Sequence, residues 1–117
     1  MEHLVFSNGF ELLTFFPEKL MYATSDGHYT KFYFNNKLSQ FFPVGIGEVV
    51  DIIGKQLPKT CENFIRVGRT LIVNKEYIYR IVVAKNTLEL VNGENLITLT
   101  PSIDALKQLK RYLENRP

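Results

Sequence analysis

The sequence predicts a mainly β protein made of antiparallel strands, with one short helix in mid-chain and a second helix at the C-terminal end. Short apolar runs rich in Val, Ile, Thr, Tyr and Phe favour strands. Turn signals such as Asn8-Gly9 and Asp26-Gly27 separate these runs, and the connections are too short for parallel crossovers. Because 117 residues supply one core, residues 1–117 are expected to form a single domain, arranged as an antiparallel meander or sandwich.

The chain contains about eight or more short strands on this interpretation. In residues 28–34 the alternation puts His28, Thr30 and Phe32 on one face and Tyr29 and Lys31 on the other. Further turns are expected at Lys85-Asn86 and at residues 92–95. The expected strands cover residues 4–6, 10–16, 19–25, 28–34, 38–42, a strand beginning at Phe64, and residues 71–73, 79–84, 87–91 and 96–100.

Two segments have the helical period instead. Residues 45–57 place apolar side chains on one helix face, and Pro58 ends that helix. Ser102 is positioned to cap the last helix, with Asp104 in its first turn. The apolar stripe of the last helix is expected to be Ile103, Leu106, Leu109 and Leu113, leaving a basic exposed side.

The net charge of +2 is unevenly distributed along the chain. In residues 1–54, three lysines against six carboxylates give −3. In residues 55–117, eleven Lys and Arg against six carboxylates give +5. A basic second half indicates an anionic partner.

The residue types that usually carry catalysis or bind metals do not form a known motif in this sequence. His3 and His28 are far apart, Cys61 is the one cysteine, and the acidic residues occur singly. We therefore expect no catalysis, no metal, no cofactor and no small-molecule substrate. No apolar run approaches the roughly 20 residues of a membrane helix, and no signal peptide is visible, which favours a cytoplasmic protein that does not bind membranes.

The central stretch from Phe64 to Arg80 is the most informative part of the chain. Arg66 and Arg69 flank Gly68, whose freedom permits a turn, and the apolar residues 71–73 follow. Guanidinium groups offer planar donor forks that suit phosphate and guanine edges, so this arrangement favours a polyanion. In the alternative interpretation both arginines are solvated, or Arg66 pairs with a carboxylate such as Glu89.

The order of these segments resembles the LytTR family of bacterial DNA-binding domains. The family's Phe-x-Arg-Val-His-Arg-Ser-x-x-Val-Asn run appears here as Phe64-Ile-Arg-Val-Gly-Arg-Thr-Leu-Ile-Val-Asn74, after a helix that ends in Gln56-Leu57-Pro58. The resemblance is strongest over residues 15–113. It implies an elongated set of antiparallel sheets that binds promoter duplexes, with loops in two successive major grooves. The receiver domain usual in the family is absent, which implies an excised piece or a stand-alone regulator, and Met1 favours the latter.

The resemblance also assigns roles to individual residues. It implies base contacts from His28, Arg69 and the region of Thr100, and contacts to the DNA backbone from Arg66, Thr70, Lys85 and Asn86. Family domains usually bind direct repeats as two copies, so a dimer on DNA is expected.

Two positions depart from the family pattern. Gly68 replaces the family's histidine, and Thr100-Pro101 replaces a frequent Ser-Arg pair. Because both changes remove side chains that reach DNA, a second hypothesis is a protein–protein interaction domain that kept the scaffold and lost DNA reading. It predicts an exposed apolar patch from Phe41-Phe42, or from Tyr77 and Tyr79.

Overall fold

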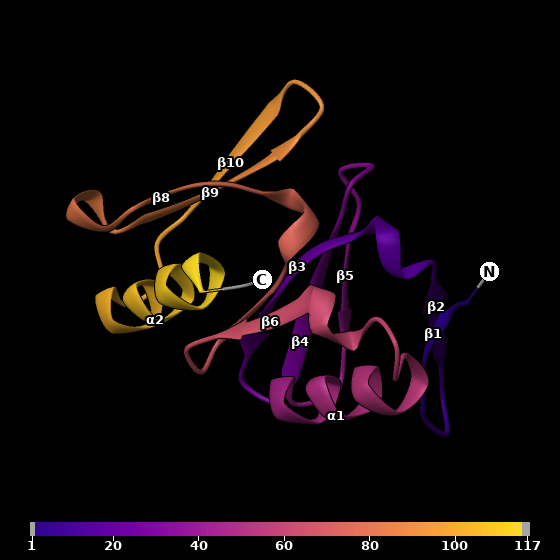
Figure 1. The fold of residues 1–117 in the computed structure, drawn as a ribbon. Helices are drawn as coiled ribbons and strands as arrows, with labels where there is room; N and C mark the ends of the chain where they lie inside the picture. Colours follow the sequence, from indigo (N-terminus) through magenta and orange to yellow (C-terminus); the bar gives the residue numbers. More distant parts are fainter. Residues whose placement is uncertain (1, 116–117) are drawn as a thin grey trace.

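The computed structural model describes residues 2–115 and confirms a mainly β fold of antiparallel sheets (Figure 1). A five-stranded sheet has the order β5-β4-β3-β7-β6 and lies between a two-stranded and a three-stranded sheet. Its strands are β3 (Leu20–Asp26), β4 (Tyr29–Phe34), β5 (Ser39–Phe42), β6 (Phe64–Val67) and β7 (Leu71–Asn74). The smaller sheets contain β1 (Leu4–Ser7) with β2 (Leu12–Phe15), and β8 (Ile78–Val82), β9 (Thr87–Asn92) and β10 (Asn95–Leu99).

The molecule is elongated, with principal extents of 44 × 30 × 28 Å. Helix α1 (Ile46–Gln56) follows β5, and helix α2 (Ile103–Glu114) follows β10. The two helices lie beside different parts of the molecule, α1 near the two-stranded sheet and α2 below the three-stranded sheet in the view of Figure 1. Both helices that the sequence predicts are therefore present.

The expectation of one core was wrong, because two hydrophobic cores meet at strand β7. One core joins α1, the β1–β2 hairpin and the five-stranded sheet, and it includes Ile72. The other core joins α2 to the three-stranded sheet, and it includes Leu71 and Val73. All four residues of β7 are buried, because its alternating side chains enter the two cores in turn.

The predicted alternation of β4 is confirmed. Thr30 and Phe32 are fully buried, whereas Tyr29 is 49% exposed. The buried Thr30 hydroxyl donates a hydrogen bond of 2.7 Å to the Val44 carbonyl, which satisfies the hydroxyl and joins β4 to the segment before α1. His28 itself lies just before the strand, in the turn.

Both helix boundaries follow the sequence signals closely. Helix α1 ends where the Leu57 amide bonds to the Ile53 carbonyl, just before Pro58. Ser102 caps α2 as predicted, because its Oγ accepts a bond of 3.3 Å from the Ala105 amide. The predicted stripe on α2 was partly wrong, since Ile103 is 47% exposed. Ala105 occupies the buried face instead, because with Leu106 and Leu109 it lies within about 100° of helix surface.

Three predicted strands end earlier than expected. Strand β2 covers only Leu12–Phe15 of the expected residues 10–16, and β10 ends at Leu99 instead of residue 100. Strand β8 is Ile78–Val82, and a 3-10 turn over Val83–Lys85 replaces the expected end at residue 84. Asn86 then takes the left-handed conformation with a φ of 56°. Asparagine tolerates this conformation better than most residues, which explains why Asn86 follows Lys85 at this turn.

We expect Asn74→Ala to lower the free energy of unfolding by about 1–3 kcal/mol, because the substitution leaves buried polar partners unsatisfied. Asn74 is 3% exposed; its amide nitrogen donates to the Leu20 carbonyl at 3.0 Å, and its amide oxygen accepts from the Glu76 amide at 3.0 Å. Urea denaturation measures the change. Asn36→Ala is the matched control, because Asn36 is exposed and accepts one local bond. Equal effects of the two substitutions would contradict the expectation.

We expect stability to fall at alkaline pH through Tyr22. Burial, together with the neighbouring Tyr33, raises the pKa of the Tyr22 phenol above the usual 10.0. The two rings are stacked 4.3 Å apart. The folded state therefore holds the proton more tightly than the unfolded state, and stability is lost as pH rises through the folded pKa. Tyr22→Phe should reduce the loss seen by urea denaturation between about pH 8 and about pH 11. The control Tyr79→Phe, at a residue 67% exposed, should not.

Candidate nucleic-acid interface

Two turns that carry predicted site residues lie side by side at one end of the strands of the five-stranded sheet. Strands β3 and β7 pair with Thr24 opposite Leu71, so the β3–β4 turn and the β6–β7 turn project from the same end of the sheet. The Ser25 amide donates a hydrogen bond of 2.9 Å to the Thr70 carbonyl and joins the two turns. The sheet therefore brings together His28 and Arg69, which are distant in sequence.

The β3–β4 turn presents His28 to solvent. Gly27 adopts a φ of 61°, and no atom lies within 4 Å of the position that a Cβ would take there. His28 is exposed and has no hydrogen bond within the described residues. Its ring is thus available to a partner at the end of the hairpin.

The β6–β7 turn contains Gly68, Arg69 and Thr70, all exposed. Gly68 has a φ of 67°, which L side chains rarely adopt, so the tight turn depends on glycine. The Arg69 side chain makes no ion pair in the part of the chain that the structure describes. The Arg69 carbonyl accepts a bond of 3.1 Å from Nη2 of Arg66.

Helix α2 begins against this turn. A Cβ added to Gly68 would lie 3.3 Å from the Ala105 Cβ, so the turn and the first turn of α2 are in close contact. Thr100 is exposed in the short loop that leads from β10 to Ser102. The start of α2 thereby brings the loop containing Thr100 to the same side of the molecule as Arg69.

The turn that contains Lys85 and Asn86 also lies beside α2, on the other side of the helix from the β6–β7 turn (Figure 1). Lys85 is exposed, whereas Asn86 is half-buried. The Asn86 side-chain oxygen is buried and has no hydrogen-bond partner among the described residues. Lys85 is therefore the more accessible of the two residues.

The family model of the LytTr DNA-binding domain matches residues 11–114. The chain belongs to the LytTR family of DNA-binding domains. Among solved structures, the chain is similar to the LytTr DNA-binding domain of a Bacillus cereus protein described as a methyl-accepting/DNA response regulator. The TM-score is 0.64 at 19% identity, and the match covers 97% of each chain, which supports the fold. No curated protein matches the chain significantly.

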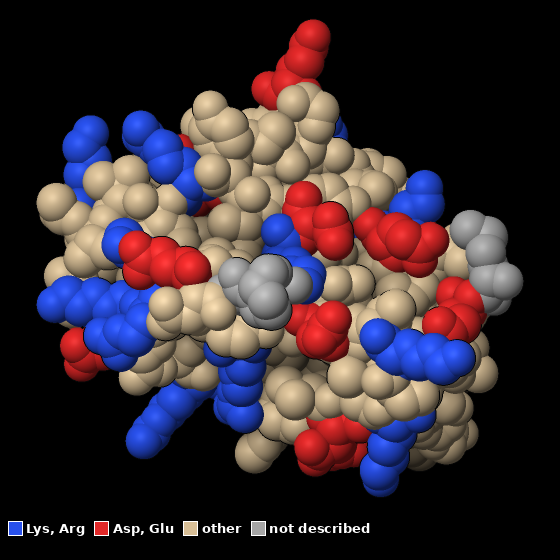
Figure 2. All heavy atoms as spheres, viewed as in Figure 1, with Lys and Arg blue, Asp and Glu red and all other residues tan. Residues whose placement is uncertain are grey.

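Positive charge gathers on the side of this LytTR domain that carries α2. Figure 2 shows Lys and Arg concentrated on the left of the view, where Figure 1 places α2 and β8. Two ion pairs neutralise part of that charge, Arg80 with Glu89 at 2.9 Å and Lys110 with Glu114 at 2.8 Å. Within residues 2–115, Arg69, Lys85 and Lys107 make no ion pair and are available to an anion.

The proposed pairing of Arg66 with Glu89 was wrong. Glu89 lies opposite Arg80 in the three-stranded sheet and pairs with it, whereas Arg66 belongs to the five-stranded sheet. The sequence analysis also missed the bond from Arg66 to the Arg69 carbonyl and the link from Ser25 to Thr70. The spacing of Arg66 and Arg69 around a glycine was the one signal that could have indicated the first contact.

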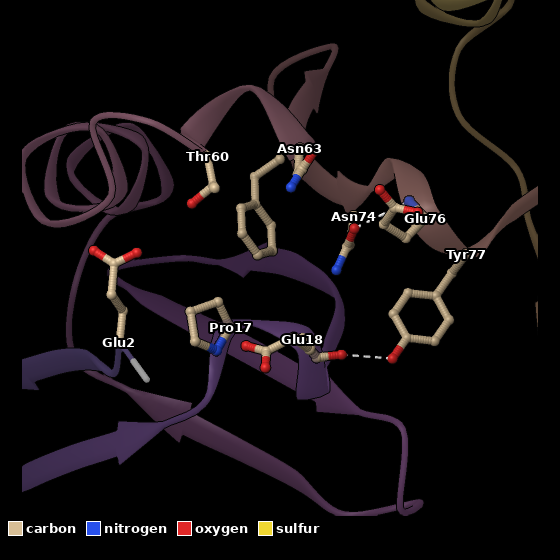
Figure 3. Close-up of a pocket in the computed structure, with 9 residues that line it drawn as sticks. Glu2, Pro17, Glu18, Thr60, Asn63, Asn74, Glu76 and Tyr77 are labelled. Atoms are coloured by element: carbon tan, nitrogen blue, oxygen red, sulfur yellow. Dashed lines mark hydrogen bonds between the residues drawn. The ribbon is translucent and has the colours of Figure 1, made fainter.

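One concave feature is distant from these turns and has the opposite charge. A pocket of about 400 Å³ lies near Asn63 and Asn74, the end of the β6–β7 pair away from Arg69 (Figure 3). Glu2, Glu18 and Glu76 line it, and none of its lining residues is Lys or Arg. The Tyr77 hydroxyl donates a bond of 2.6 Å to the Glu18 carbonyl at its border. Such a pocket repels a polyanion, so the exposed turns remain the candidate site.

The described residues also bear on three other kinds of surface or site. Within residues 2–115, no His, Cys, Asp and Glu side chains gather in a group suited to a metal ion. Neither described helix is long and apolar enough to cross a membrane. The apolar patch expected from Phe41-Phe42 does not form, because Phe42 is 4% exposed and belongs to the first core.

We expect Gly68→Ala to destabilise the domain more than Gly27→Ala. Both glycines have φ near 60°, so both substitutions incur the left-handed backbone cost of about 1–2 kcal/mol. Only at position 68 does the new Cβ meet Ala105, at 3.3 Å, whereas position 27 is open. Urea denaturation of the two variants measures the difference. Equal losses would show that α2 does not press on the β6–β7 turn.

Proposed function

We propose that this LytTR domain reads duplex promoter DNA as a bacterial transcriptional regulator, by placing its loops in successive major grooves. His28, Arg69 and the region of Thr100 contact bases, and Thr70, Lys85 and Asn86 contact the backbone. The observation that carries the proposal is that separate turns, at β3–β4, β6–β7 and the start of α2, come together with unpaired positive charge. Two copies bind direct repeats, in the cytoplasm, without a cofactor or a catalytic step.

The chemistry of the turns supports this proposal. A guanidinium donates two parallel hydrogen bonds to the O6 and N7 of guanine, and an imidazole can donate to or accept from a base edge. Lys85 provides a cation for phosphate, which contributes affinity without sequence information. Exposed residues on rigid hairpins are suited to such contacts, because the sheet fixes their spacing before DNA arrives.

The protein–protein alternative has less support. Of the residues that it needs, Phe42 is buried and the Tyr77 hydroxyl is bound to the Glu18 carbonyl. Phe41 is 42% exposed, and its ring lies 5.0 Å from the Lys31 amine. Tyr79 is 67% exposed and remains the best single contact for a protein partner.

The test begins with selection of duplexes from a random-sequence pool, followed by fluorescence anisotropy at about 50 and 200 mM salt. The proposal predicts that an enriched duplex binds more tightly than a scrambled duplex of the same length and composition at both salt concentrations. Equal binding of the two duplexes, lost at the higher salt, would contradict sequence reading and favour the protein–protein alternative.

We expect Arg69→Ala to weaken binding to the enriched duplex by about 1–3 kcal/mol, because the substitution removes a base contact. Binding to the scrambled duplex should change little. Lys55→Ala is the matched control, since Lys55 is an exposed cation in the last turn of α1, away from the proposed interface. If Arg69→Ala weakens both duplexes equally, Arg69 contacts the backbone rather than a base.

A further inference from the structure

Arg66 folds back onto the hairpin that carries Arg69. Strand alternation puts Arg66 and Phe64 on the α1 side of the sheet, whereas Val67 enters the α2 core. From that side, Nη2 of Arg66 donates a hydrogen bond of 3.1 Å to the Arg69 carbonyl. Nη1 lies 3.5 Å from the position of a Cβ on Gly47, so the guanidinium also covers the first turn of α1.

The β6–β7 turn is therefore held from three directions. On one side the Thr70 carbonyl accepts the Ser25 amide at 2.9 Å, and on another Gly68 contacts Ala105 of α2. The Arg66 guanidinium holds the Arg69 carbonyl on the α1 side. Because a peptide unit is planar and includes the preceding Cα, holding the Arg69 carbonyl orients the peptide plane that contains the Arg69 Cα and so restricts where the Arg69 side chain points.

We propose that Arg66 is a positioning residue, which directs Arg69 toward its base instead of contacting phosphate itself. The inference rests on the proposed function, because it assumes that Arg69 reads DNA. It replaces the backbone contact that the family resemblance implies for Arg66. The guanidinium is required rather than a positive charge alone, since its fork spans Gly47 and the Arg69 carbonyl together, which a single ammonium cannot do.

The two roles of Arg66 give different results in binding experiments. A phosphate contact contributes equally to every duplex and to the salt dependence, and lysine replaces arginine there. A positioning contact contributes to the enriched duplex only, leaves the salt dependence unchanged, and is not restored by lysine. Losing the positioning contact also causes no further loss of affinity once the Arg69 side chain is removed.

The experiment compares Arg66→Ala, Arg66→Lys, Arg69→Ala and the double variant Arg66→Ala/Arg69→Ala, on the enriched duplex and its scrambled control. We expect both Arg66 variants to raise the Kd for the enriched duplex about tenfold. The Kd for the scrambled duplex and the slope of log K against log salt should stay unchanged. The double variant should bind no more weakly than Arg69→Ala.

A parallel loss on both duplexes, with the slope shallower by about one unit and rescue in Arg66→Lys, would overturn the proposal. Amide hydrogen exchange of residues 68–70 in the free protein is the second measurement. Arg66→Ala should accelerate it, and unchanged exchange would also overturn the proposal. If the wild-type protein does not distinguish the two duplexes, the proposed function fails, and the exchange experiment still decides whether Arg66 holds the turn.

Discussion

The burial of strand β7 on both faces is the constraint on which the rest of the structure depends. Ile72 enters the core with α1, and Leu71 and Val73 enter the core with α2. A slip of one residue would exchange the two sets of side chains, so the register of β7 is strongly specified. That register also places residues 68–70 beside the end of β3, which is how one strand determines both packing and the candidate interface.

The interface follows from this arrangement because the β6–β7 turn lies where the two cores meet. Its α1 side receives the Arg66 guanidinium, and its α2 side receives Ala105. The surface of the turn stays open, which leaves Arg69 and Thr70 exposed on a backbone that is held from several directions. Loops that bind ligands are usually mobile. Under the proposed function, a turn held by these contacts loses less entropy when its side chains bind DNA.

Local signals in the sequence were enough to predict most of the fold. The Asn-Gly and Asp-Gly turns, the alternation around Thr30 and the Ser102 cap each depend on residues a few positions apart, and each is present. The family run around Gly68 identified the turn that carries Arg69. The partners of Arg66 and Glu89 could not be predicted, because several cations were available to one carboxylate and only the sheet arrangement selects among them. Ile103 was misplaced because its helix could be rotated without breaking the local pattern.

The two departures from the family pattern have one structural location. Gly68 contacts the first turn of α2, and Pro101 immediately precedes the Ser102 cap of the same helix. A histidine at position 68 would need a left-handed backbone and would meet Ala105, so it requires α2 to move away. Proline fixes φ just before the helix starts and thereby restricts where α2 begins. The close approach of α2 thus occupies the space around both positions. Under the proposed function, base reading then rests on His28, Arg69 and the region of Thr100, which α2 leaves exposed.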